Sequence, residues 1–260
     1  MIVVTGAVLV GLVFGSFATV LIERVPKGEQ WQTGRSRCEE CSAPIAWYDN
    51  VPVLSWLLLR GKCRSCATPI SPRYPLIEIG MGAGFGLVFL TVDDLVLATV
   101  LAYMLWLGTV LSVIDVLHMR LPDALVAPSY PIIGAGLILD FLVAHGSGSL
   151  WRAAAGAGIA LGIYGGLWLV YPKGIGFGDV KLAPLIGMVA GYLGWAQLAV
   201  GLFAAPFLGL IAAVIVGMRR GSIAKTRIPY GPAILVGMWV GLMSGPALAD
   251  VYLGVVGAGS

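Results

Sequence analysis

Long apolar runs separated by short polar stretches dominate this chain and predict membrane-spanning helices. One helical span of a bilayer takes about 20 mostly apolar residues. Residues 76–114 and 182–217 are each long enough for two spans, and we divide them at Asp93-Asp94 and near Gly194. The pattern then predicts about eight spans: Ile2–Ile22, Leu76–Val92, Leu95–Ile114, Ala124–Ala144, Ala153–Tyr171, Leu182–Gly194, Gln197–Gly217 and Gly231–Leu253.

This pattern divides the chain into three parts. Residues 1–22 lack a basic start and a small-residue cleavage site, so we interpret them as a retained first transmembrane helix. Residues 23–75 form a polar insert that contains all the cysteines, and residues 76–260 form the remaining membrane core. We therefore expect an all-α, polytopic integral membrane protein with one small cysteine-bearing insert.

Composition and charge support this fold class and orient the chain. It is 58% hydrophobic and only 11% charged, with a mean hydropathy of +0.93, whereas soluble domains carry roughly 25% charged residues. All but Arg152 of the 16 Lys and Arg residues fall in loops on one side, 23–75, 115–123, 172–181 and 218–230. The positive-inside rule then places these loops in the cytoplasm and both termini outside.

The insert contains two CxxC pairs, Cys38 with Cys41 and Cys63 with Cys66. Four thiolates at this spacing suit tetrahedral zinc, and a site with four protein ligands is structural because it leaves no position for a reacting water. Metal binding would also supply folding free energy to an insert with few large apolar residues. Free thiols and two disulfides are the alternatives, and a cytoplasmic insert disfavours disulfides.

Most acidic residues have an ordinary surface explanation. Those of the insert are expected to be solvated: Glu23, Glu29, Glu39, Glu40 and Asp49. Those at the outer helix ends are expected to be interfacial loop charges: Asp93, Asp94, Asp140 and Asp250.

Four acidic residues remain, and all lie at the cytoplasmic ends of predicted spans: Glu78, Asp115, Asp123 and Asp179. Ionisable groups beside spans are costly and are therefore functional candidates. Asp115 and Asp179 are expected at the same depth on different helices, where one protonated and one ionised carboxyl group would form an acid–base pair. An ion or proton pathway would use the same residue types. Asp123 either complements a helix dipole or supports the pair.

Several motifs, in order, are similar to those of the type IV prepilin peptidases, which are membrane aspartic peptidases of the GxGD type. They are Phe14-Gly-Ser-Phe17 with Ile22-Glu-Arg-Val-Pro26, the CxxC insert, Ser55-Trp56 with Leu59-Arg-Gly-Lys-Cys63 and Ser71-Pro-Arg-Tyr-Pro-Leu-Ile-Glu78, Asp115 to Leu121-Pro-Asp123, Gly176-Phe-Gly-Asp-Val-Lys181, and Ile228-Pro-Tyr-Gly-Pro232. The chain departs from the family at Thr19, where Asn is frequent.

The resemblance implies an enzyme of the bacterial cytoplasmic (inner) membrane that cleaves the basic leader of prepilins or pseudopilins after a glycine, at the cytoplasmic face. Many members also methylate the new N-terminus with S-adenosylmethionine. Asp115 and Asp179 match the catalytic positions, and Glu78 is the candidate for binding or methyl transfer. The implied supporting residues are Asp123, Glu78, Gly176, Gly178 and Lys181. The implied partners are a pilin precursor and the bilayer, with no nucleic acid.

Three alternatives stay open at this point. The chain could be a peptidase without methyltransferase activity, or a cation or proton transporter that uses the same aspartates. It could also be a zinc-bearing membrane scaffold without catalysis, which would tolerate loss of both aspartates but not of the cysteines.

Overall fold

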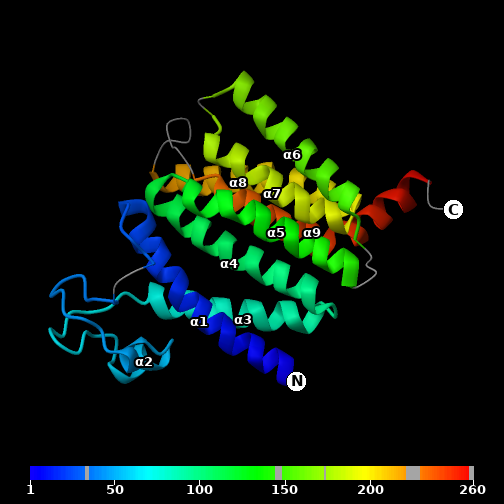
Figure 1. Ribbon diagram of the computed structural model, residues 1–260. Helices are drawn as coiled ribbons and strands as arrows, with labels where there is room; N and C mark the ends of the chain where they lie inside the picture. The colour runs from blue at the N-terminus through cyan, green and yellow to red at the C-terminus, as the bar shows by residue number, and fades with distance from the viewer. Residues whose placement is uncertain (33–34, 144–147, 173, 221–228, 258–260) are drawn as a thin grey trace. The chain divides into compact units, whose positions relative to one another are not determined.

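A computed structural model describes residues 1–32, 35–143, 148–172, 174–220 and 229–257, and every regular element in these ranges is a helix (Figure 1). The predicted all-α class is confirmed. Lys173, Lys225, Arg227 and Ile228, which contributed to the charge pattern and the last motif, lie outside the described residues, as does Ala144. The elements are α1 (Ile2–Arg24), η1 (Val25–Lys27), η2 (Trp47–Asn50), α2 (Leu54–Leu58), α3 (Arg73–Thr91), α4 (Leu95–His118), α5 (Asp123–Val143), α6 (Leu150–Val170), α7 (Phe177–Leu193), α8 (Trp195–Arg220) and α9 (Gly231–Val256).

Within the described ranges, 7 helices are long and apolar enough to cross a membrane, namely α1, α3, α4, α5, α6, α8 and α9. The remaining predicted span corresponds to α7, which has 17 residues. At a rise of 1.5 Å per residue it is about 25 Å long, slightly less than the roughly 30 Å of a hydrocarbon core.

Several helices extend beyond the apolar runs that predicted them, and two of these extensions contain candidate aspartates. The predicted third span ends at Ile114, whereas α4 continues to His118. The predicted sixth span begins at Leu182, whereas α7 begins at Phe177. Backbone hydrogen bonding continues through polar residues at a span's end, so Asp115 lies in the last turns of α4 and Asp179 in the first turn of α7.

The chain divides into two compact units, Met1–Val110 and Leu111–Ser260, which we call unit 1 and unit 2. In unit 1, α1 packs closely against α3. A Cβ on Gly15 would lie only 2.6 Å from the Cα of Glu78, and one on Gly11 would lie 2.5 Å from the carbonyl oxygen of Met81. Small residues spaced in this way allow membrane helices to approach closely, and the contact holds Glu78 against α1.

Unit 2 is built around α7, which contacts α5, α6, α8 and α9 and buries most of its residues. In Figure 1, α7 (yellow) lies among these neighbours. Its closest approach is to α6, where a Cβ on Gly156 would lie 2.3 Å from the carbonyl oxygen of Gly187. Because α7 is enclosed by other helices, a polar side chain at its start is removed from bulk solvent.

The interpretation of Asp140 as an interfacial loop charge is wrong. α5 continues to Val143, so Asp140 lies inside the helix, 3% exposed. Its carboxylate accepts a 2.5 Å hydrogen bond from the hydroxyl of Tyr192, and the carbonyl oxygen of Tyr192 accepts one from Arg152 at 3.3 Å. Asp140 is buried because it faces Tyr192 where α5 packs against α7.

Candidate active site

Asp115 is buried near the end of α4 and is held by the start of α9. Its Oδ2 accepts a hydrogen bond of 3.0 Å from the backbone N–H of Gly231, the first residue of α9. Free N–H groups at a helix start carry partial positive charge and stabilise an anion. A Cβ on Gly231 would lie 2.9 Å from the same carboxylate oxygen, so glycine is required for this approach.

Asp179 is buried in the first turn of α7 and belongs to a local capping arrangement. Its Oδ2 accepts a 3.2 Å hydrogen bond from the N–H of Gly176, and its own N–H donates to the carbonyl oxygen of Gly176 at 3.0 Å. The carboxyl group satisfies an otherwise free donor at the helix start and lies at the favourable end of the helix dipole.

The structure brings these two aspartates together around Leu121. A Cβ on Gly178 would lie 3.0 Å from Leu121 Cβ, and one on Gly231 would lie 3.4 Å from Leu121 Cδ2. One leucine therefore packs beside the neighbours of both Asp115 and Asp179. The two carboxyl groups are also near enough to interact electrostatically.

Two tyrosines complete the surroundings of Asp179. Tyr164 of α6 is buried, and its ring centroid lies 6.3 Å from that of Tyr230, which immediately precedes α9. Both hydroxyl groups interact electrostatically with Asp179. Helices α4, α6, α7 and α9 therefore all contribute to one polar site in an otherwise apolar unit.

Asp123 and Lys181 form a separate, more exposed pair next to this site. Lys181 Nζ lies 2.7 and 2.8 Å from the two carboxylate oxygens of Asp123, and it also lies 4.8 Å from the ring centroid of Phe177. The hydroxyl of Tyr130 donates to the carbonyl oxygen of Lys181 at 2.6 Å. The charge of Asp123 is thus matched by a cation.

Asp115 and Asp179 differ in this respect. In the ranges that the structure describes, neither has a Lys, Arg or His partner within ion-pair distance. Two adjacent buried carboxylates without a cation cannot both ionise at low cost, and sharing one proton relieves their repulsion. The arrangement can therefore supply a general acid and a general base side by side.

Glu78 belongs to unit 1, and the structure keeps it buried on α3. Its Oε2 accepts a 2.7 Å hydrogen bond from the N–H of Val53, the residue that precedes α2. Thr19 is also buried, and its hydroxyl donates to the carbonyl oxygen of Ser16 at 2.7 Å. Glu78 thus fastens the insert to α3 and stays within a partly polar region between α1 and α3.

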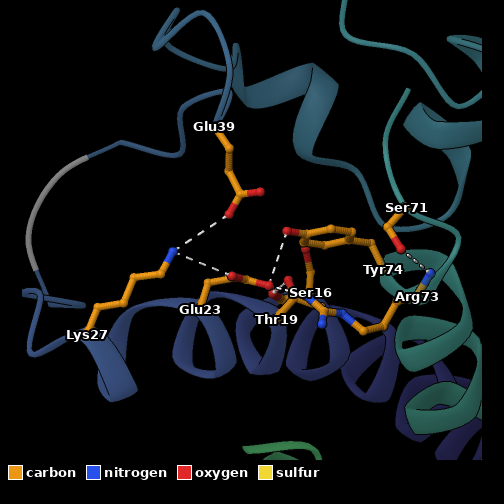
Figure 2. A network of polar contacts seen from close by, with 8 residues as sticks. All are labelled: Ser16, Thr19, Glu23, Lys27, Glu39, Ser71, Arg73 and Tyr74. Carbon is orange, nitrogen blue, oxygen red and sulfur yellow. Dashed lines mark hydrogen bonds and ion pairs between the residues drawn. The ribbon is translucent and has the colours of Figure 1, made fainter. Parts of the chain in front are cut away.

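Figure 2 shows a second polar network of unit 1, in which Glu23 is the common partner. Glu23 pairs with Arg73, lies 3.7 Å from Lys27, and accepts a 3.5 Å hydrogen bond from the hydroxyl of Tyr74. Lys27 also lies 3.9 Å from Glu39. The expectation of a solvated Glu23 is therefore wrong, because this half-buried carboxylate joins the end of α1 to the start of α3.

The four cysteines come together as the CxxC pattern predicts. Their sulfur atoms all lie within 4.8 Å of one another, and Cys38 Sγ and Cys66 Sγ are 3.8 Å apart. A tetrahedral zinc ion with Zn–S bonds of about 2.3 Å separates its sulfurs by about 3.8 Å. The cluster can therefore hold a metal ion of this kind, and all four thiols are free of disulfides.

Two similar turns present these sulfurs. The N–H of Cys38 donates to Ala43 and that of Ser42 to Cys38, while the N–H of Cys63 donates to Thr68 and that of Ala67 to Cys63. The Thr68 hydroxyl, whose oxygen is 3.3 Å from Cys66 Sγ, lowers the pKa of that thiol to about 6. At Cys66 the thiolate, which is the form that binds metal, is then favoured at neutral pH.

The sequence motifs do not indicate three contacts that hold candidate residues, two around the aspartates of unit 2 and one at Glu78 of unit 1. Gly231 and Leu121 belong to the motifs but have no role that the motifs define, and Val53 lies outside them. Each contact joins distant parts of the chain, so no local spacing indicates it. The only signal in the sequence was a glycine at a helix start, where an anion can bind.

The fold defines a polytopic helical membrane protein with a cysteine-bearing insert between its first two long helices, and unit 2 contains a buried pair of carboxyl groups. Two family models match this arrangement. Residues 9–92 match the bacterial peptidase A24 N-terminal domain, and residues 101–214 match the type IV leader peptidase family. The chain belongs to the type IV leader peptidase family, which confirms the family indicated by the sequence motifs.

Curated relatives support the same assignment over nearly the whole chain. The relatives are named prepilin leader peptidase/N-methyltransferase. The one from Stutzerimonas stutzeri is 31% identical to this chain, and the match covers 95% of this chain and 92% of the relative. The one from Aeromonas hydrophila is 32% identical, covering 94% and 92%. The one from Neisseria gonorrhoeae is 34% identical, covering 90% and 88%. No solved structure matches the chain.

Proposed function

We propose that this chain is a membrane-embedded aspartic endopeptidase that removes the basic leader of type IV prepilins or pseudopilins, after a glycine, at the cytoplasmic face of the bacterial inner membrane. We also propose that it methylates the new N-terminus. The names of the relatives support both activities. The observation that carries the peptidase proposal is the buried pair of Asp115 and Asp179, which has no cationic partner among the described residues.

In the proposed mechanism a water molecule lies between the two carboxyl groups. The ionised carboxylate takes a proton from the water as the water oxygen attacks the carbonyl carbon of the leader glycine at the scissile bond. The other carboxyl group gives its proton to the departing amine nitrogen, and the C–N bond breaks. The products are a leader with a new carboxyl terminus and a pilin with a new amino terminus.

The surrounding residues have positioning roles in this proposal. The N–H groups of Gly231 and Gly176 hold the two carboxyl groups in place. Gly178 leaves room for Leu121, and the Asp123–Lys181 pair fastens the start of α5 to α7. A prepilin would place its apolar helix in the membrane and its basic leader on the cytoplasmic side, which is the side of the loops that contain most Lys and Arg residues. Its scissile bond would then lie at the depth of the aspartates.

The proposed methyl transfer uses S-adenosylmethionine, whose sulfonium group supplies an electrophilic methyl group when bound. The nucleophile is the new amine, which must first lose a proton. Glu78 is the residue that we assign to holding this ammonium group or accepting its proton, since its buried carboxylate lies beside α1 and is hydrogen-bonded to neutral groups, the N–H of Val53 and the hydroxyl of Ser16. The Cys38, Cys41, Cys63 and Cys66 cluster would hold a structural zinc ion.

The peptidase proposal is tested with purified protein, a prepilin peptide and S-adenosylmethionine, with mass analysis of both product ends. Asp115→Asn and Asp179→Asn should each lower cleavage by about 1,000-fold or more, since general acid–base catalysis contributes up to about 10⁴-fold. Asp250→Asn, an exposed change on α9, is the matched control and should cleave normally. Full processing by either active-site variant would refute the assignment.

Zinc is tested separately by metal analysis of the purified protein. We expect one zinc ion per chain in the unmodified protein and its loss in Cys63→Ser. Ser65→Ala, within the same turn, should keep the metal. A protein that contains no zinc, or whose zinc survives the cysteine substitution, would contradict the proposal while leaving the peptidase assignment intact.

A further inference from the structure

The insert of unit 1 exposes an apolar face on its short helix α2. Leu54, Leu57 and Leu58 are 52%, 58% and 73% exposed, and residues three and four apart lie on the same side of a helix. The other side of α2 packs inwards, where Ser55 Oγ donates to the carbonyl oxygen of Tyr48 at 2.8 Å and Trp56 Nε1 donates to that of Ile70 at 3.1 Å. The leucines are therefore directed away from the insert.

One hydrogen bond places the start of α2 beside a membrane-spanning helix. The N–H of Val53, directly before α2, donates to Glu78 Oε2 at 2.7 Å. Glu78 lies in the second turn of α3, a helix long and apolar enough to cross the membrane. Leu76, near the beginning of α3, is 66% exposed, as expected for a side chain that faces lipid. The leucine face of α2 thus begins at a depth where α3 already enters the bilayer.

The residues around α2 are those found at membrane surfaces. Trp47 lies in η2, beside α2, and is 83% exposed. Trp is enriched at bilayer interfaces because its ring is apolar and its N–H is polar. Arg60 and Lys62 follow α2 and are exposed, and basic side chains at this level attract anionic phospholipids. Apolar, aromatic and basic side chains therefore occur together on one short segment.

We propose that the face formed by Leu54, Leu57 and Leu58 lies in the phospholipid interface beside α3, with Trp47 at the same boundary and with Arg60 and Lys62 near anionic headgroups. Together with the Val53–Glu78 hydrogen bond, this contact would hold the cysteine-bearing insert against the membrane surface. A protein partner is disfavoured because three leucines offer far less area than the roughly 1,200 Å² that stable protein interfaces bury.

The proposal is tested by photo-crosslinking in the full chain, reconstituted into nanodiscs of phosphatidylethanolamine and phosphatidylglycerol. The photoreactive residue p-benzoylphenylalanine replaces Leu57 in one sample and Ser65, an exposed residue of the cysteine cluster, in a matched control. After illumination, mass analysis identifies what is attached to each position. We expect several-fold more phospholipid adduct at position 57 than at position 65.

The same measurement contains the outcomes that would overturn the proposal. Equal lipid adducts at the two positions, or none, would show that α2 does not contact lipid. A dominant adduct with a second copy of the chain, or with an added prepilin, would assign the leucine face to a protein partner instead. In a second sample, Arg60→Gln with Lys62→Gln should reduce the share of phosphatidylglycerol among the adducts, and an unchanged share would remove the basic residues from the proposal.

A second measurement needs no change at the leucines. Phospholipids with bromine near the top of the acyl chain quench tryptophan emission at short range, and Trp47→Phe removes the contribution of Trp47. The difference between the emission of the unmodified protein and that of Trp47→Phe is the emission of Trp47. We expect this emission to be quenched by the brominated lipid and protected from aqueous acrylamide. The reverse pattern would show that this part of the insert projects into water, whatever the crosslinking yields.

Discussion

Glu23 of unit 1 and the two aspartates Asp115 and Asp179 of unit 2 differ in what stabilises their carboxyl groups. In unit 1, Glu23 pairs with Arg73 and lies 3.7 Å from Lys27. In unit 2, Asp115 and Asp179 accept hydrogen bonds from backbone N–H groups, and in the described part of the chain no basic side chain is paired with either of them. All three carboxyl groups are partly or fully buried, so burial alone does not distinguish Glu23 from the two aspartates.

This difference separates a structural carboxylate from one that is available for chemistry. A cation beside a carboxylate stabilises its ionised form and ties it to one position. Two neighbouring carboxyl groups without a cation share their protons, and a proton can then leave or arrive during a reaction. We therefore expect changes in the Glu23 network of unit 1 to act mainly on stability, and changes around Asp115 and Asp179 of unit 2 to act mainly on cleavage.

After substitution of the aspartates themselves, the largest effect is expected from Gly231→Ala. The added Cβ would lie 2.9 Å from Asp115 Oδ2, and this end of a flexible side chain would move aside. A displacement of about 1 Å at a catalytic group can lower the rate about 100-fold. Thermal unfolding should change little, because the atom that gives way is not part of the packed backbone. Cleavage assays and unfolding scans on the same preparation measure both quantities.

Gly254→Ala is the matched control, since it makes the same change on the same helix where nothing lies within 4 Å. It should cleave normally. If both variants lose activity equally, the effect belongs to the helix α9 and not to the hydrogen bond with Asp115. If neither does, the position of Asp115 is less important than its burial and pairing suggest.

The next effect tests Glu78, the buried carboxylate of unit 1 that does not belong to the Glu23 network. Glu78→Gln keeps an oxygen to accept the N–H of Val53 but removes the negative charge. Loss of a charged hydrogen-bond partner costs about tenfold, so methylation should fall by about that factor while cleavage continues. Mass analysis of product ends reports both at once, and Glu40→Gln, an exposed insert change, should affect neither.

An unchanged methylation yield in Glu78→Gln would leave Glu78 with the structural role of holding Val53. Glu78→Ala, which also removes that acceptor, would then be expected to loosen the insert. Equal loss of cleavage and methylation would mean that Glu78 acts on the whole fold. The assignment of methyl transfer to Glu78, separate from cleavage at Asp115 and Asp179, would then be wrong.

The sequence allowed a prediction of the spans, the cysteine cluster and the two aspartates, because apolar runs, CxxC spacing and isolated acidic residues are local signals. It could not indicate the hydrogen bond between Gly231 and Asp115, which lie 116 positions apart. It also misplaced Asp140, because the burial of this side chain against Tyr192 depends on how α5 packs against α7. Contacts made by helix packing require the fold itself.

A smaller effect, on stability, is expected in the Glu23 network. Arg73→Gln removes the partner of a half-buried Glu23, and after solvent screening this should cost roughly 1 kcal/mol. Arg37→Gln removes an exposed partner of Glu29 at 3.8 Å and should cost no more than a few tenths of a kcal/mol. Thermal unfolding of both variants measures the contrast, and both should cleave normally. A large loss of cleavage in Arg73→Gln would place unit 1 within the peptidase mechanism.

The smallest effect is expected at Asp123, which lies close to Asp115 in the sequence but resembles Glu23 in having a cation. Its oxygens lie 2.7 and 2.8 Å from Lys181 Nζ, and the two side chains are 66% and 36% exposed. Exposed pairs contribute about 0.2–1 kcal/mol, so Asp123→Asn should change cleavage by less than about threefold. Lys181→Gln should have a similarly small effect, and combining the two should add little, because each alone already breaks the pair. If Asp123→Asn instead abolishes cleavage as Asp115→Asn is expected to do, a neighbouring cation does not distinguish structural from reactive carboxylates in this chain, and Asp123 belongs with the proposed catalytic residues.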